Sequence, residues 1–409
     1  MDFSFEAGII RALSEIVKSG HLVKGDKPVY WCPDCNSALA EAEVEYKDKL
    51  SVSIDFLFEV ETSAVNKIFS TSVKDDIKTS FISWTTTPWT IPGNVALSVN
   101  SALDYSLMEV QIDNKKQCLI ISKELVESVM ERCSITDFST LSTIPGSNLK
   151  SIEARHPYFD RKSIVILADH VTTEMGTGIV HTAPAHGLED FHASNKYMLE
   201  ILNYVGPDGT FTDAAKDFSR MNLDEASKKS IEMLEETSNL LSKESYQHSF
   251  PHCWRHKTPL FFRATPQWFI SMTAENLLQN SISSIDSVNW MPDWGKSRIT
   301  SMMEERPDWC ISRQRTWGVP IALYLHKKTG ELHPDTFSIM QKVADEVEKS
   351  GTDLWFEQNL ETVNVGEDYE PVMDILDVWF DSGVTHYCVL NEQRGLSQPA
   401  DLYLEGSDQ

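Results

Sequence analysis

Two short segments that lie far apart in the chain decide the fold: KPVYWCPDCNSALAEAEVEY at residues 27–46 and HSFPHCWRHKTPL at residues 248–260. Each contains a pair of metal-ligating side chains separated by two residues, namely Cys32 and Cys35, then Cys253 and His256. A tight turn with this spacing aims both side chains at one point, which suits a tetrahedral ion. We therefore expect one structural zinc site made from both pairs.

The region between the two pairs, residues 46–245, is expected to be an inserted domain. If both pairs bind one ion, the chain leaves and re-enters its host domain through two adjacent strands. Two alternatives stay open on the residues alone. Cys32 and Cys35 by themselves fit a redox pair, and His252 fits as a ligand in place of His256.

Composition indicates a globular protein of two or three domains, since 409 residues exceed one ordinary core. A net charge of −25 argues against a nucleic-acid partner, although residues 255–315 are richer in basic side chains. Seven cysteines, five of them isolated, do not form a disulfide framework. The chain has no apolar run long enough to span a membrane and no signal-peptide layout, so we expect a cytoplasmic protein.

Strand-like and helix-like segments alternate along the chain, which predicts an α/β fold. Residues 1–23 have the apolar spacing of a helix that ends at Gly20. Between residues 46 and 245, apolar runs typical of strands are separated by turn signals and by two helical stretches at residues 123–133 and 223–241.

Residues 84–94, WTTTPWTIPGN, combine three consecutive threonines with two prolines. Threonines in a row commonly reflect β-propensity alone. The prolines end the strand, however, so the segment is expected to form a rigid ledge that offers hydroxyl and N–H groups to a small polar ligand.

Residues 176–191, GTGIVHTAPAHGLEDF, place a loop with His186, Glu189 and Asp190 directly after an apolar strand that ends at His181. Loops at strand ends commonly form binding pockets. The alternative is a helix N-terminus whose dipole is matched by the two carboxylates. A metal site formed by the two histidines is also open, though no third ligand has a fixed spacing.

Together these segments resemble the isoleucyl-tRNA synthetase family of class I aminoacyl-tRNA synthetases. The resemblance continues through HCWRHKTPLFFRATPQWF (252–269), RPDWCISRQRTWGVPI (306–321), DILDVWFDSG (374–383) and LYLEGSDQ (402–409), so it covers nearly the whole chain. It implies a partial Rossmann-type catalytic domain, an inserted α/β, β-barrel-like editing domain and a zinc knuckle.

The resemblance also implies roles for individual residues. The editing pocket would contain Thr85, Thr86, Thr87, Asn94, His181 and Asp190. In the family, the matching aspartate holds the α-amino group of the misacylated amino acid. The aminoacyl-adenylate would be contacted by Glu405, Gly406, Asp408 and Gln409, with Trp379 as a wall of the isoleucine pocket. For Trp379, an ordinary core position is the alternative.

The family's two ATP signature motifs are expected before residue 1 and after Gln409, and neither is present in this sequence. We therefore expect an internal fragment that keeps editing chemistry, while ATP and magnesium are substrates of the full-length enzyme. The expected parts are part of the catalytic domain (1–23), the first half of the zinc knuckle (24–45), the editing domain (46–245), the second half of the knuckle (246–262) and the truncated catalytic domain (263–409).

The expected function is that of an isoleucine-tRNA ligase by lineage, with hydrolysis of misacylated Val-tRNA(Ile) as the retained activity. The expected partners are tRNA(Ile), isoleucine and mischarged valine, and the chain is expected to be a monomer without a membrane. Two alternatives remain open, a non-catalytic tRNA-binding fragment and a valyl-type synthetase.

Overall fold

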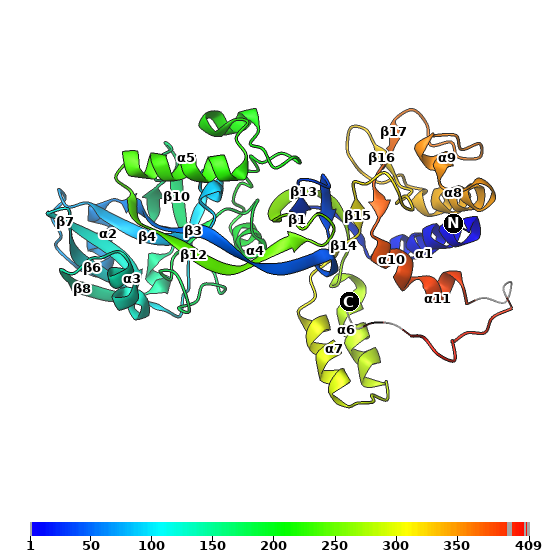
Figure 1. The fold of residues 1–409 in the computed structure, drawn as a ribbon, viewed down its shortest axis with the longest axis horizontal. Helices are drawn as coiled ribbons and strands as arrows, with labels where there is room; N and C mark the ends of the chain where they lie inside the picture. The colour runs from blue at the N-terminus through cyan, green and yellow to red at the C-terminus, as the bar shows by residue number, and fades with distance from the viewer. Residues whose placement is uncertain (1, 391–394, 405, 407–409) are drawn as a thin grey trace. The chain divides into compact units, whose positions relative to one another are not determined.

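The computed structural model describes residues 2–390, 395–404 and 406, and the chain divides into two compact units. The first unit consists of Met1–Val44 and Thr265–Gln409, and the second of Glu45–Ala264. Both units contain helices and strands (Figure 1), which confirms the predicted α/β class. Among the described residues, no helix combines the length and the apolar character that a membrane crossing requires.

The first unit contains helices packed beside small sheets. Its helices are α1 (Phe3–Lys18), η1 (Glu41–Glu43), η6 (Ala274–Asn276), α6 (Leu277–Asp286), α7 (Trp294–Glu304), α8 (Thr336–Ser350), α9 (Asp353–Phe356), α10 (Val378–Gly383) and α11 (Thr385–Cys388). One sheet has the order β14 (Trp309–Cys310), β13 (Phe261–Ile270), β1 (Leu22–Cys32), β2 (Ser37–Leu39). Two further antiparallel pairs are β15 (Ser312–Arg313) with β18 (Ile375–Leu376) and β16 (Tyr324–His326) with β17 (Tyr369–Pro371).

Helix α1 shows why the first segment of the chain is helical. Asp2 caps it by accepting a hydrogen bond from the Ser4 N–H at 2.9 Å. Ile10 and Leu13 lie on its buried face and share one apolar core with Val343 of α8. The helix was predicted to reach Gly20 but ends at Lys18, and Gly20 adopts a φ of +79° just beyond it, as glycines after helix C-termini commonly do.

A buried arginine organises the polar centre of the first unit. The Arg313 guanidinium lies 2.9 Å from a Glu43 carboxylate oxygen and 3.0 Å from one of Asp377, and all three side chains are at most 1% exposed. Asp377 also accepts a hydrogen bond from Trp309 Nε1 at 2.9 Å and is the N-cap of α10. Because a buried charge is stable only when it is paired, this cluster fixes where α10 begins.

The second unit is built on one large mixed sheet. Its strands are β3 (Val44–Val60), β4 (Thr79–Thr85), β5 (Ala96–Val99), β6 (Asp104–Ile112), β7 (Lys115–Ser122), β8 (Phe138–Pro145), β9 (Glu153–Arg155), β10 (Lys162–Leu167), β11 (Val180–Thr182) and β12 (Leu240–Cys253). The order is β11-β5-β10-β9-β3-β4-β7-β6-β8, and β12 also pairs with β3. The β10–β5 and β4–β7 pairs are parallel.

The sheet of the second unit is covered on both faces. Alternate residues of a strand point to opposite faces. Accordingly, Phe56 and Phe58 of β3 enter one buried core, whereas Leu57 enters another with Ile82 of β4. The helices of this unit are α2 (Thr62–Phe69), η2 (Pro88–Gly93), η3 (Lys123–Leu125), α3 (Val126–Arg132), η4 (Gly146–Leu149), α4 (Leu188–Lys196), η5 (Asp213–Phe218) and α5 (Leu223–Glu236).

The strand that leads into the second metal-ligating segment is long. The sequence predicts a strand on either side of the ligand pair without fixing its length, and β12 has 14 residues. In this mostly polar strand every second residue from Tyr246 to Phe250 is aromatic. The ring centroids of Tyr246 and His248 are 5.5 Å apart, and those of His248 and Phe250 are 5.4 Å apart. Strand periodicity is therefore present, carried by aromatic rather than aliphatic residues.

Candidate functional site

A cavity of about 330 Å³ lies in the second unit, at the ends of β4 and β11. Two segments of the chain supply most of its wall: the threonine-rich turn that follows β4 and the stretch from His170 to Asp190. Of the six predicted editing residues, five line it: Thr85, Thr86, Thr87, His181 and Asp190.

A serine in β4 holds the two segments together. The Ser83 hydroxyl donates to the Ile179 carbonyl at 2.8 Å and accepts from the His181 N–H at 3.0 Å. His181 itself lies in β11 opposite Leu97 of β5 in an antiparallel pair. Segments nearly a hundred residues apart are thus fixed side by side by a buried side chain.

The threonine-rich turn is rigid. Thr85 Oγ1 accepts a hydrogen bond from the Thr87 N–H at 3.1 Å and lies 3.2 Å from Thr87 Oγ1. Pro88 then begins the 3-10 helix η2, in which Thr90 Oγ1 donates to the Thr87 carbonyl at 2.9 Å. Thr86 and Thr87 remain partly exposed in the cavity wall. The Thr86 hydroxyl is available to a ligand, and the Thr87 hydroxyl keeps hydrogen-bonding capacity beyond its contact with Thr85.

The hydrogen bonds around His181 determine its proton arrangement. Because the Thr90 hydroxyl donates to Thr87, it accepts from His181 Nε2, 2.8 Å away. Nδ1 is then unprotonated and faces Asn94 Nδ2 at 3.4 Å. Burial lowers the pKa of His181 to about 4, so the ring is neutral at pH 7.

Asn94 lies behind the cavity wall rather than in it. Its side chain is fully buried, donates to the Ala96 carbonyl at 2.8 Å and accepts from Ser163 Oγ at 2.5 Å. The predicted residue therefore contacts the site through His181. Sequence spacing could not reveal this, because the depth of a residue behind a turn depends on how the turn packs.

Asp190 lies in the first turn of α4, where its Oδ2 accepts a hydrogen bond from the Ala183 N–H at 2.9 Å. Its side chain is 17% exposed. Burial raises the pKa of this carboxyl to about 6, while the hydrogen bond from Ala183 acts in the opposite direction. The carboxylate is thus charged at pH 7 but lies close to its titration point.

Two polar residues of this cavity with a part in its hydrogen bonding or charge, Thr90 and His170, were not predicted from the sequence. Thr90 is part of the quoted turn but has no pattern of its own. His170 follows the apolar strand β10 within three residues, which is the same strand-end signal that identified the loop after His181. His186 also lines the cavity; its Nδ1 donates to the Phe262 carbonyl at 2.9 Å, and burial lowers its pKa to about 4.

The residues predicted to contact an aminoacyl-adenylate are only partly described. Trp379 lies in α10 with its indole Nε1 buried and without a hydrogen-bond partner among the described residues. Gly406 is exposed. Glu405, Asp408 and Gln409 lie outside the described residues.

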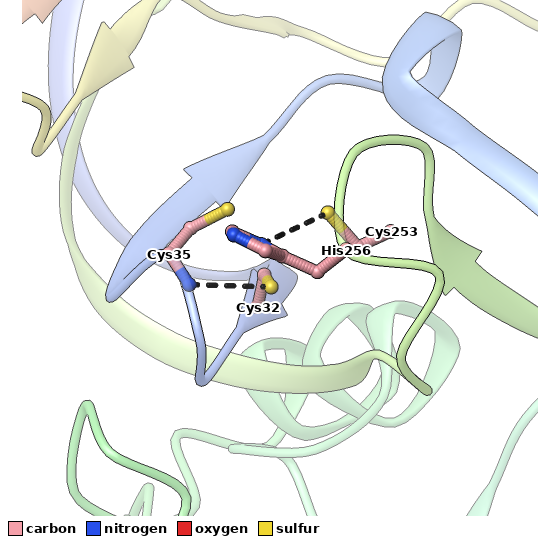
Figure 2. A group of neighbouring side chains, drawn as sticks. All are labelled: Cys32, Cys35, Cys253 and His256. Carbon is pink, nitrogen blue, oxygen red and sulfur yellow. Dashed lines mark hydrogen bonds between the residues drawn. The ribbon is translucent and has the colours of Figure 1, made fainter.

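The four predicted metal ligands, Cys32, Cys35, Cys253 and His256, form one cluster (Figure 2). One ligand atom from each lies within 4.8 Å of the others. The Cys253 Sγ and His256 Nδ1 atoms are 3.9 Å apart, and the Cys35 N–H points at Cys32 Sγ from 3.4 Å. A tetrahedral zinc ion with bonds of about 2.3 Å needs neighbouring donors roughly 3.7 Å apart, so this donor set could hold a metal ion.

The whole chain matches a known family. The family model for tRNA synthetases class I (I, L, M and V) covers residues 1–409. The isoleucine–tRNA ligases of Coxiella burnetii (strain CbuG_Q212) and Vibrio parahaemolyticus are each 50% identical to this chain, over 414 and 417 residues. That of Pseudoalteromonas translucida is 49% identical over 415 residues. Each alignment covers 100% of this chain and 44% of the relative, so the chain spans less than half the length of these proteins.

Solved structures give a weaker likeness. The editing domain of the P. knowlesi cytosolic leucyl-tRNA synthetase has a TM-score of 0.39 and 12% identity, covering 49% of this chain and 97% of that chain. This similarity is too low to support an argument about the site. The sequence match over the whole chain is sufficient, and it confirms the predicted family: the chain belongs to the class I tRNA synthetases of the isoleucine, leucine, methionine and valine group.

Proposed function

We propose that this chain is part of an isoleucyl-tRNA synthetase and carries the site that hydrolyses misacylated Val-tRNA(Ile). Sequence identity of about 50% to isoleucine–tRNA ligases supports the lineage. One observation carries the activity: a single cavity is lined by the Asp190 carboxylate and by the polar groups of Thr85–Thr87.

The chemistry assigned to this cavity is hydrolysis of an ester. Asp190 pairs with the α-ammonium of the aminoacyl group, since a charge-assisted hydrogen bond is the strongest contact available there. The hydroxyls of Thr86 and Thr87 hold the ester and a water molecule. The water oxygen bonds to the acyl carbon, the bond to the terminal ribose oxygen of the tRNA breaks, and that oxygen leaves with a proton. The products are valine and tRNA(Ile).

His181 is a positioning residue in this proposal rather than the general base. A general base near neutral pH needs a pKa near the working pH and a free ring nitrogen. In His181 the pKa is about 4, Nε2 donates to Thr90 and Nδ1 faces Asn94. Its ring therefore keeps the threonine turn in place, and the leaving tRNA hydroxyl and the water exchange protons without it.

A hydrolytic site suits an enzyme that selects isoleucine. One methylene group distinguishes valine from isoleucine and is worth about 1–3 kcal/mol of binding, a range for which this enzyme family is itself the standard example. A difference of that size in one binding site does not exclude valine sufficiently. A second site that hydrolyses the valyl product is therefore needed.

The proposal also assigns the parts of the chain. The second unit, Glu45–Ala264, corresponds to the editing domain, and the first unit to part of the catalytic domain. The longer protein would attach isoleucine to tRNA(Ile) with ATP and magnesium as substrates. Trp379 would form part of the isoleucine pocket, and the adenylate would be contacted by Glu405, Gly406, Asp408 and Gln409. We propose a cytoplasmic monomer.

Zinc is the metal we propose for the Cys32, Cys35, Cys253 and His256 cluster. Three sulfurs and one imidazole nitrogen are the donors of structural zinc sites, and four protein ligands leave no position for a substrate. The backbone N–H of Cys35 directed at Cys32 Sγ is an outer-shell contact of the kind that stabilises a thiolate. The ion would therefore stabilise the fold and take no part in hydrolysis.

The experiment that tests the editing function is deacylation of Val-tRNA(Ile) and Ile-tRNA(Ile) by the purified chain in single turnover. We expect faster release of valine. Asp190→Ala should lower that rate about ten- to a hundredfold, since hydrogen bonds to charged groups are worth about 1.5–3 kcal/mol.

Asp169→Ala is the matched control, because its carboxylate is 91% exposed and does not line the cavity. It should hydrolyse Val-tRNA(Ile) at the rate of the unmodified chain. Equal rates on the valyl and isoleucyl esters, or an unchanged rate in Asp190→Ala, would refute the editing function. Preferential hydrolysis of threonyl-tRNA(Val) would instead identify a valyl-type enzyme.

A further inference from the structure

One ring nitrogen of His170 is buried and makes no hydrogen bond to the described residues. This nitrogen, Nε2, is inaccessible to solvent, although the imidazole as a whole is 23% exposed. Leaving such a group unpaired costs about 1–3 kcal/mol, so a buried orphan nitrogen in a cavity wall is a point where a bound donor would be stabilised. The cavity that His170 lines is the one that also contains Asp190.

The orphan nitrogen faces the carboxylate assigned to the ammonium. His170 Nε2 lies 3.9 Å from Asp190 Oδ1, whereas Asp190 Oδ2 is occupied by the Ala183 N–H. A separation of 3.9 Å is too long for a direct hydrogen bond. A nitrogen placed about 2.9 Å from each of the two atoms would bridge them, with one of its hydrogens directed at each.

The charge state of His170 suits the role of acceptor. Burial lowers its pKa, so the ring is neutral at pH 7 and Nε2 can carry a lone pair while Nδ1 carries the proton. Among the charged groups around it, Glu189 and Asp169 favour protonation and Lys196 opposes it, and Asp190 faces Nε2 directly. A neutral imidazole attracts an ammonium group, whereas an imidazolium would repel it.

We propose that His170 is a second binding residue for the α-ammonium group of the aminoacyl ester, with Nε2 accepting one N–H while Asp190 Oδ1 accepts another. This inference rests on the proposed editing function and deepens it, because it explains how the site recognises an aminoacyl ester rather than any ester. The ligand class is an α-amino acid ester with a protonated amine. The threonine-rich turn contacts the ester group of the ligand, and His170 contacts only its amine.

The test compares two substrates that differ only in the amine. Valyl-tRNA(Ile) carries it, and 3-methylbutanoyl-tRNA(Ile) has the same carbon skeleton without it. His170→Phe keeps a ring but removes the acceptor, and His170→Ala removes both. We expect each to lower kcat/KM for the valyl ester roughly tenfold, mainly through KM, and to leave hydrolysis of the 3-methylbutanoyl ester unchanged.

Two further variants separate recognition from folding. His170→Gln offers an amide oxygen in place of Nε2 and should recover most of the lost activity on the valyl ester. His192→Ala removes an exposed histidine of α4 that does not line the cavity, and it should behave as the unmodified chain. Urea unfolding of every variant shows whether the protein remains folded. If His170→Ala is unfolded, the inference is tested by comparing kcat/KM for the valyl ester between His170→Phe and His170→Gln.

An equal loss on both esters would overturn the inference, because it would mean that His170 only shapes the wall. An unchanged kcat/KM for the valyl ester in His170→Phe would overturn it as well. Failure of the editing function is separately visible, since the unmodified chain would then not hydrolyse the valyl ester or would not depend on Asp190.

Discussion

At the scale of single residues, the cavity combines an acid and a base whose pKa values are shifted in opposite directions by burial. Burial disfavours whichever form carries charge, so it raises the pKa of Asp190 to about 6 and lowers that of His181 to about 4. Between these values and pH 7, Asp190 gains its charge while His181 stays neutral. The site therefore offers one anionic group for a cation and no competing protonated ring.

This difference predicts the pH dependence of hydrolysis. A carboxyl with a pKa of about 6 is charged above that pH and neutral below it, and only the charged form pairs with an ammonium. The rate with Val-tRNA(Ile), corrected for hydrolysis without protein, should therefore fall as pH decreases from about 7 to about 5. Asp190→Asn should give a low rate without this decline. A profile of the unmodified chain that is flat over the same range would show that the Asp190 charge is not used.

At the scale of elements, the wall of the cavity depends on a glycine-rich approach to β11. Gly176 and Gly178 both have a positive φ, +81° and +73°. Only Gly178 is also crowded, since a Cβ there would lie 2.3 Å from the Ser122 Cβ at the end of β7. Close contact between this loop and β7 therefore requires glycine at position 178 for two separate reasons.

Replacing each glycine by alanine separates the two reasons. Gly176→Ala pays only for the left-handed backbone, about 1–2 kcal/mol, because its new Cβ meets the Trp84 ring at an ordinary contact distance of 3.7 Å. Gly178→Ala adds an overpacking cost of about 1–3 kcal/mol. The free energy of unfolding in urea should thus fall more for Gly178→Ala. Equal losses in the two variants would contradict the crowding at Ser122.

At the scale of the whole molecule, the sequence predicted what carries a motif and missed part of what does not. The α/β class and the cavity segments carry clear local signals. The helix N-terminus that was left open as an alternative for Glu189 and Asp190 is present as the first turn of α4. Helices α6 and α7 were not predicted, although Leu278, Ile282 and Ile285 of α6 recur at helical spacing, and neither helix has a buried residue. His170 was missed although it follows β10 within three residues, because the sequence does not show that it lies beside Asp190, which comes from another segment of the chain.

The metal cluster is also a property of the whole chain, because its two ligand pairs are separated by more than half of the sequence. We expect metal analysis of the purified chain to give about one zinc ion. Removing it with a chelator should lower the unfolding temperature, since metal binding to a folded site adds to folding free energy. Cys32→Ser should abolish zinc binding, whereas Cys133→Ser, which changes a cysteine outside the cluster, should retain the ion. A metal-free chain with the same unfolding temperature before and after chelation would contradict the zinc assignment.

The hydroxyl of Ser83 has a consequence for how opening of the cavity could be observed. It accepts the His181 N–H, so this amide is shielded from solvent by a side chain of β4 rather than by a neighbouring strand's carbonyl. Exchange of that amide hydrogen for deuterium requires β4 and β11 to separate. Its protection factor is therefore a direct gauge of the free energy that keeps the cavity wall closed, and a bound aminoacyl analogue should slow that exchange further.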